Sequence, residues 1–507
     1  SEGLKTIGIN LVDKSTGKEY EVAVQPANVG VYSWTTPLSV PEGADYIISI
    51  ATPDVDGLAD ASDAPFSIVA ASSVLPAGKE FSQFSLRATP KKAPADFSEA
   101  TAARFKPMAI YNDGLTQTSM EVKRASKGGT ISGEFINVKS LLLVRGSSSS
   151  TMPVTLYDDG TNGDAVANDG IYTLFPITSI AATDQFGNRI HWDSFILRIG
   201  SDQLRARLAI VKNGINFPVR LLGQADDGTA LQASEYVVNI QDRAYLDGSS
   251  YGSVSDNIGA ITKKLYKVFD DAFDFIIVWS VLKADTSDHY SSVRNEIRGL
   301  GDSGMCAIHD ISDIWNTPPP EKDKGRLAGI PYINDGGVSV YSSLHEEILH
   351  RWGVCFGRAL GFGFPFGFHW SGDIDAATAY IGNINGGLKG ADVVEKPDGT
   401  FTTTSRSFAV RYAALELYLM GLIPESEVPS YTFYKYQRAD QKILEKFTLD
   451  INKLRSAFGP RIPLVENSQK KFRSAFVVVS PPGEELTDAE FGLFSIAAEH
   501  FGSSSAG

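Results

Sequence analysis

Cysteine is nearly absent from this sequence. Cys306 and Cys355 are the only two among 507 residues. A fold stapled by many disulfides is therefore excluded, because such scaffolds need several bridges in a short chain. The single pair leaves two states open, which are one disulfide bond and two buried thiols.

Long apolar segments and an excess of positive charge are also missing. The longest nearly apolar run, Phe275 to Leu282, is far shorter than the ~20 residues that span a bilayer, so we expect no transmembrane segment. Lys and Arg number 46 against 60 Asp and Glu, which gives a net charge of -14. Because nucleic acids and anionic membranes bind clustered basic residues, we expect neither as a principal partner.

The composition that remains is typical of a multidomain globular protein, since 507 residues far exceed the roughly 150 of one domain. Residues 1–92 alternate short β-type runs with turns, at the spacing of a β-sandwich. After a connector rich in Pro, Ala and charge, a second β-rich block occupies residues 107–223. Mixed helix and strand patterns fill residues 234–502. We therefore predict two N-terminal all-β sandwiches followed by an α+β domain.

An Asp/Gly-rich loop in the second block, DDGTNGDAVAND, offers the hard oxygen ligands that Ca²⁺ prefers. The candidate ligands are Asp158, Asp159, Asn162, Asp164 and Asp169. Their spacing imitates part of an EF-hand loop, but Gly160 stands where a side-chain ligand is required, and β-type runs flank the loop. A calcium site and a metal-free hairpin turn both remain open.

The stretch SSLHEEILHRWG, residues 342–353, carries the groups of a zinc site at an irregular spacing. In H-E-x-x-H the two histidines share a helix face, whereas His345 and His350 are five apart, or about 140° around a regular helix. In one solution Glu346 becomes the partner ligand of His350, which leaves Glu347 as the general base. In another, a π-bulge returns His345 to the face of His350. In a third, the helix serves only the fold.

Other segments give this helix a context. HEEILHRWG, together with VFDDAFDFIIVWS, GFHWSGD and AALELYLMGLIPESEVP, resembles a group of large bacterial secreted proteins with gluzincin-like metallopeptidase features, whose helix reads H-E-x-G-H-R-W. The match spans residues 234–501. It implies a zincin-like domain in which His350 is a zinc ligand, Glu347 is the catalytic glutamate and His369 is a distant third ligand. The chain departs from the pattern at Glu346, which stands in the place of the first histidine.

The N-terminal regions carry resemblances of their own. The segment NVGVYSWTTPLSVPEGADYIISIATPDVDGLADASDAPFSI resembles repeats of Ser/Thr-rich cell-wall and surface proteins, which implies an immunoglobulin-like module. VTLYDDGTNGDAVANDGIYT resembles β-sandwich modules that stand beside anchoring and enzymatic domains of bacterial surface proteins. Both resemblances imply an extracellular protein, either secreted or held at the cell surface.

Two functions follow as hypotheses. In the first, zinc is bound and a protein or peptide is the substrate, but endopeptidase activity is weak or lost because Glu346 lowers the net charge of the site. In the second, the chain is a non-enzymatic structural or adhesive protein, with a surface partner or further copies of itself as its contacts. A glycosidase is disfavoured because no convincing carboxylate pair stands out.

Overall fold

The computed structural model describes most of the chain. The described residues are 6–26, 41, 43–51, 59–61, 66–68, 103–136, 141–143, 151–224, 230–242, 259–281, 288–301, 304–312, 325–333, 342–355, 369–404 and 412–503. The chain divides into two compact units, Ser1–Leu86 and Arg87–Gly507. Most of the predicted connector lies outside the described residues, which resume at residue 103. Among the described helices, none has the length and apolarity needed to cross a membrane.

The first unit contains one antiparallel sheet in the order β2-β1-β3-β4, with β5 also paired to β3. Its strands are β1 (Thr6–Asp13), β2 (Lys18–Pro26), β3 (Gly43–Ala51), β4 (Ala59–Ala61) and β5 (Phe66–Ile68). Leu11 and Tyr46 are buried on one face of this sheet. The strand-rich pattern of the sequence is therefore present here, while the immunoglobulin-like sandwich remains a prediction.

The second unit begins with a sheet that curls on itself, which we name the rolled sheet. Its strand order is β6-β8-β12-β11-β9-β13-β14-β7, with β10 on β12. The strands are β6 (Ala103–Lys106), β7 (Ala109–Tyr111), β8 (Thr118–Lys123), β9 (Gly129–Ile136), β10 (Leu141–Leu143), β11 (Thr151–Asp158), β12 (Ile171–Ser179), β13 (Ile190–Ile199) and β14 (Asp202–Val211). Only Pro107 and Met108 separate β6 from β7 in sequence, so the two ends of the strand order must meet. The rolled sheet encloses its own apolar core, in which Phe195 contacts Phe105 and Phe135 edge-on.

A mixed sheet, which we name the central sheet, follows in the order β15-β16-β17-β29-β18-β22-β19. Its strands are β15 (Arg220–Gln224), β16 (Ala230–Ala233), β17 (Val237–Gln241), β18 (Phe275–Ser280), β19 (His289–Ser292), β22 (Gly329–Ile333) and β29 (Ser474–Ser480). The four strands β17, β29, β18 and β22 run parallel, and β19 is antiparallel to β22. Every residue of β18 is buried, and its largely apolar sequence FIIVWS is typical of a parallel strand covered on both faces.

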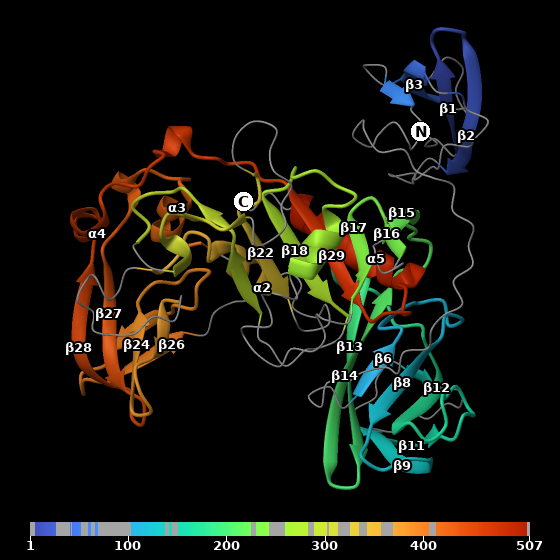
Figure 1. Ribbon diagram of the computed structural model, residues 1–507, viewed down its shortest axis with the longest axis horizontal. Helices are drawn as coiled ribbons and strands as arrows, with labels where there is room; N and C mark the ends of the chain where they lie inside the picture. The colour runs from blue at the N-terminus through green and yellow to red at the C-terminus, as the bar shows by residue number, and fades with distance from the viewer. Residues whose placement is uncertain are drawn as a thin grey trace, which may run out of the picture. The chain divides into compact units, whose positions relative to one another are not determined.

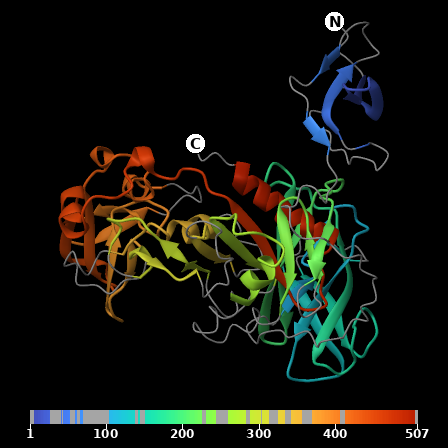
Figure 2. The same ribbon diagram turned by 45° about the horizontal axis from the view of Figure 1, so that its top comes forward.

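Helices cover both faces of the central sheet. The face that carries Trp279 packs against α5 (Asp488–Ser503), where the Trp279 and Phe494 rings stack at 5.6 Å. The α5 helix lies across the sheet in both views (Figures 1 and 2). A helical segment at residues 259–265 contributes Ile261 and Leu265 to the core on the opposite face. The helix α2 (Ser342–Leu349) packs beside β22 and β19, near the antiparallel edge of the sheet.

The remaining part of the second unit contains a smaller antiparallel sheet with the order β23-β24-β27-β28. Two-stranded sheets and short helices accompany it. The further elements are β20 (Arg294–Asn295), η1 (Gly304–Cys306), β21 (His309–Asp310), β23 (Ser371–Asp373), β24 (Thr378–Gly382), β25 (Asp392–Glu395), β26 (Phe401–Thr404), α3 (Ala414–Met420), η3 (Glu425–Glu427), β27 (Tyr431–Gln437), β28 (Lys442–Leu449), α4 (Ile451–Phe458) and η4 (Val465–Asn467). The α3 helix ends at Gly421, whose left-handed φ of 77° is the conformation that glycine adopts readily at a helix C-terminus. The second unit thus combines helices with several sheets, while the bounds of the α+β domain and its zincin-like fold remain predictions.

Candidate metal centre

The α2 helix keeps regular α-helical spacing through the candidate ligands. Leu344 and Leu349 are buried in the apolar core, and Glu347 and His350 are buried as well, so α2 is enclosed on more than one side. The backbone N–H of His350 donates to the carbonyl of Glu346 at 3.2 Å, which is the α-helical pairing. After His350 the chain forms a turn, in which the backbone N–H of Trp352 donates to the carbonyl of Leu349, and Val354 adopts a left-handed φ of 44°. The predicted π-bulge is not formed at this position.

His345 lies apart from the other candidate ligands. Its ring is 5.0 Å from that of Phe501 and 6.4 Å from that of Tyr412. Because successive helical residues are rotated by about 100°, a regular helix that presents Glu346 turns His345 away. The structure therefore selects Glu346 over His345 as the helical neighbour of His350.

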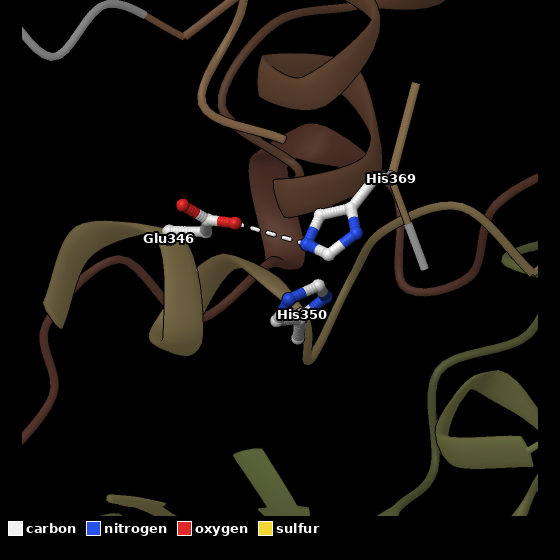
Figure 3. A group of neighbouring side chains, drawn as sticks. All are labelled: Glu346, His350 and His369. Carbon is white, nitrogen blue, oxygen red and sulfur yellow. Dashed lines mark ion pairs between the residues drawn. The ribbon is translucent and has the colours of Figure 1, made fainter. Parts of the chain in front are cut away.

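Glu346, His350 and His369 form a compact group, which we name the metal cluster. Each offers a ligand atom, and these atoms all lie within 4.8 Å of one another. Figure 3 shows Glu346 on α2 and His350 directly after its last residue, with His369 reaching them from a separate segment. The Nε2 atom of His369 is 2.9 Å from Oε1 of Glu346, and the rings of His350 and His369 are 5.0 Å apart. Two imidazoles and one carboxylate make up the donor set of several catalytic zinc sites.

A lysine that the sequence analysis did not select completes the surroundings of Glu346. Lys389 Nζ is 2.8 Å from Glu346 Oε1, and the lysine side chain is 53% exposed. Its backbone has a left-handed φ of 57°, and its carbonyl accepts a hydrogen bond from the Ser371 hydroxyl. The local sequence GGLKGA gives no indication that this lysine belongs to the site, because only the fold brings Lys389 next to Glu346.

The electrostatics of the cluster prepare two of its members to bind a cation. Burial alone would raise the pKa of Glu346, but the contacts with His369 and Lys389 lower it to about 2. Burial lowers the pKa of His350 to about 3, and the neighbouring His369 adds to this effect. At neutral pH Glu346 is therefore ionised and His350 is neutral, which are the protonation states that a metal ligand requires.

Glu347 is the next residue along α2 and is buried, with 6% of its surface exposed. Its Oε2 atom is 3.9 Å from Nε2 of His350 and accepts no hydrogen bond from the described residues. Burial raises the pKa of Glu347 to about 9, and the nearby carboxylates of Glu346 and Asp288 contribute. A buried carboxyl oxygen without a hydrogen-bond partner is costly, so Oε2 of Glu347 also indicates that this site suits a cation.

The Asp/Gly-rich loop gathers three of its five candidate calcium ligands. Carboxylate oxygens of Asp158, Asp164 and Asp169 lie within 4.8 Å of one another. Asp158 is fully buried and accepts backbone N–H groups from Asp169 at 3.0 Å and from Gly170 at 3.1 Å. Burial raises the pKa of Asp169, and Asp158 and Asp164 add to the rise. These hydrogen bonds account for the turn itself, and calcium binding remains a prediction.

The two other candidates of that loop point elsewhere. Asp159 accepts the backbone N–H of Thr161 at 2.9 Å and its hydroxyl at 2.6 Å, as in an Asx turn. The side-chain amide of Asn162 donates to the Thr161 hydroxyl, and the backbone of Asn162 is left-handed. Both side chains are exposed and lie outside the group of three carboxylates.

The two cysteines form a disulfide bond, with 5.9 Å between their Cα atoms. This settles the question that the sequence left open. Cys306 ends η1, and Cys355 follows the turn after His350, so the bond ties this turn to a separate part of the chain. The disulfide thus limits how far the backbone that carries His350 can move.

Neither a known protein-family model nor a curated protein sequence matches the chain. The chemistry of the site must therefore be argued from its residues and their geometry.

Proposed function

We propose that this is a secreted or cell-surface protein whose α+β domain binds zinc through Glu346, His350 and His369 and resembles a metallopeptidase. The observation that carries the proposal is the metal cluster itself. A glutamate and a histidine, one helical turn apart, meet a second histidine from a distant segment within 4.8 Å. The disulfide supports an oxidising, extracellular setting, because such bonds are rare in the reducing cytosol.

Zinc is expected to prevail over Lys389 in the competition for Glu346. The lysine side chain is 53% exposed, and ion pairs at exposed positions contribute only about 0–1 kcal/mol. Structural zinc sites bind with apparent free energies on the order of 10 kcal/mol. The ammonium group is therefore a weak competitor that can move into solvent when the metal binds.

Glu347 is the group proposed to transfer protons. Bound zinc would supply an acidified water molecule and a polarised substrate carbonyl. Glu347 lies beside His350 and would accept a proton and return it to the leaving amine. Its raised pKa means that it holds its own proton in the metal-free site at neutral pH. A neighbouring cation favours the ionised form, so the base becomes competent only when the metal is bound.

The donor types do not by themselves require loss of activity. A carboxylate and two imidazoles serve as ligands in active zinc peptidases. This chain differs from the family that it resembles in the position of the carboxylate ligand. Glu346 stands where the family pattern has the first histidine of the helix. We accordingly propose weak endopeptidase activity toward a protein or peptide substrate.

The first test is the metal content of the purified full chain. We expect stoichiometric zinc in the wild type and its loss in His350→Ala and Glu346→Ala, with His345→Ala as the matched control that retains it. Absence of zinc from the wild type, even after incubation with added metal, would overturn the proposal and favour a non-enzymatic structural or adhesive role. A second measurement compares peptide hydrolysis by Glu347→Gln, which should keep zinc and lose activity.

A further inference from the structure

A buried carboxylate that belongs to neither α2 nor the metal cluster is hydrogen-bonded to the segments that carry His369 and Lys389. Glu416 is in the first turn of α3 and is completely buried. Its Oε1 accepts the indole N–H of Trp370 at 2.7 Å and the backbone N–H of Leu388 at 3.0 Å. Its Oε2 accepts the backbone N–H groups of Ala413 at 2.7 Å and Gly387 at 2.9 Å. One side chain therefore joins three segments that are far apart in sequence.

The first of these segments carries His369. Trp370 follows it directly, is completely buried and is fixed to Glu416 through its ring nitrogen. The backbone N–H of Trp370 also donates to the carbonyl of Leu388 at 2.7 Å, and the Tyr380 hydroxyl donates to the carbonyl of His369 at 3.2 Å. The direction in which His369 leaves the backbone thus depends on the residue that Glu416 holds.

The second segment is the glycine loop, residues 385–390, which carries Lys389. A Cβ atom at Gly386 would lie 2.4 Å from a carboxylate oxygen of Glu416, so the absence of a side chain allows this close approach. A Cβ atom at Gly353 would lie 2.1 Å from the Leu388 side chain, which therefore abuts the turn after His350. The glycine loop thus lies between Glu416 and the end of α2.

We propose that Glu416 is a positioning residue of the metal centre, which holds His369 opposite Glu346 and His350 at the spacing that a metal requires. This inference rests on the proposed function, because it assumes that the cluster binds a metal. Groups that orient metal ligands through hydrogen bonds typically affect metal affinity by 10- to 100-fold. Glu416 acts through Trp370 and the glycine loop rather than by touching the metal.

The test measures the zinc dissociation constant of the full chain by competition with a chelating dye. Trp370→Phe removes the indole N–H and keeps an aromatic ring, and Glu416→Gln replaces an acceptor oxygen by an amide nitrogen. We expect each to weaken zinc binding by about 10- to 100-fold. We also expect each to shift the visible spectrum of the cobalt-loaded protein, which reports ligand geometry.

A matched control separates positioning from stability. Glu490 is another buried carboxylate and lies in the first turn of α5. It accepts the backbone N–H groups of Met108 at 2.8 Å and Thr487 at 2.9 Å. Glu490→Gln should lower the thermal midpoint without changing zinc affinity or the cobalt spectrum.

The outcomes are distinct. Unchanged affinity and spectrum in Trp370→Phe, with zinc bound by the wild type, would overturn the inference alone. Failure of the wild type to bind zinc would overturn both it and the proposed function. Should Glu416→Gln not fold, Trp370→Phe decides.

Discussion

His350 donates its backbone N–H to the carbonyl of Glu346, and this 3.2 Å hydrogen bond fixes which side chains can meet. The bond spans one regular helical turn, so Glu346 and His350 project from the same face. His345 is rotated from that face toward Phe501. The five-residue spacing of His345 and His350 therefore occurs on a regular helix in which Glu346, and not His345, shares the face of His350.

Returning an imidazole to that position should test the effect of the carboxylate. In Glu346→His the site loses one negative charge, which makes the bound metal a stronger Lewis acid. We expect zinc to be retained and kcat/KM for a fluorogenic peptide to rise. An unchanged or lower kcat/KM with full zinc occupancy would show that Glu346 does not limit activity.

Removing Lys389 should strengthen metal binding. Its ammonium group contacts Glu346 at 2.8 Å and must yield that oxygen when zinc binds. Because an ion pair of this exposure contributes about 0–1 kcal/mol, Lys389→Met should tighten zinc binding by up to about fivefold at low salt, and less at high salt. Titration calorimetry measures the change, and Lys470→Met serves as a control for the loss of one surface charge. Weaker binding in Lys389→Met would mean that the lysine supports the metal-bound state.

Several observed elements correspond to signals that are local in the sequence. The capping box at the start of α5 forms between Thr487 and Glu490, and Gly421 ends α3. The apolar run of β18 is a fully buried strand. Each of these features depends on neighbours along the chain, which is why the sequence reveals them.

Long-range relationships could not be read in this way. The strand β29 lies between β17 and β18 although it is far from both in sequence. The sequence left open the choice between Glu346 and a π-bulge, and the α-helical hydrogen bond from the backbone N–H of His350 to the carbonyl of Glu346 decides it. A weak signal did exist for Glu416, since it is the single acid within the apolar helix ALELYLM, but its partners are set only by the fold.

The pH dependence of stability should report Glu347 in the metal-free protein. Its pKa is about 9 in the folded state and near 4.3 in an unfolded chain, so the folded state keeps a proton that the unfolded state releases. Proton binding by Glu347 therefore favours the folded state. This stabilisation is fully present below the unfolded pKa and is lost as the pH rises toward 9. Glu347→Gln should therefore stabilise the protein in chelator at pH 8 by more than about 1 kcal/mol relative to its effect at pH 4.5. Equal effects of the substitution at both pH values, measured by urea unfolding, would contradict the raised pKa.

Removal of the disulfide should affect both stability and the metal. The bond closes a loop with a sequence separation of 49 residues, which corresponds to about 4 kcal/mol in the chain-entropy description. The double variant Cys306→Ser, Cys355→Ser should therefore unfold at lower urea concentration. Because Cys355 follows the turn that carries His350, we also expect weaker zinc binding, measured with the same chelating dye at a temperature where the variant is folded. Lower stability with unchanged zinc affinity would show that packing of Trp352 and Leu388, both buried beside this turn, is sufficient to hold His350 in place.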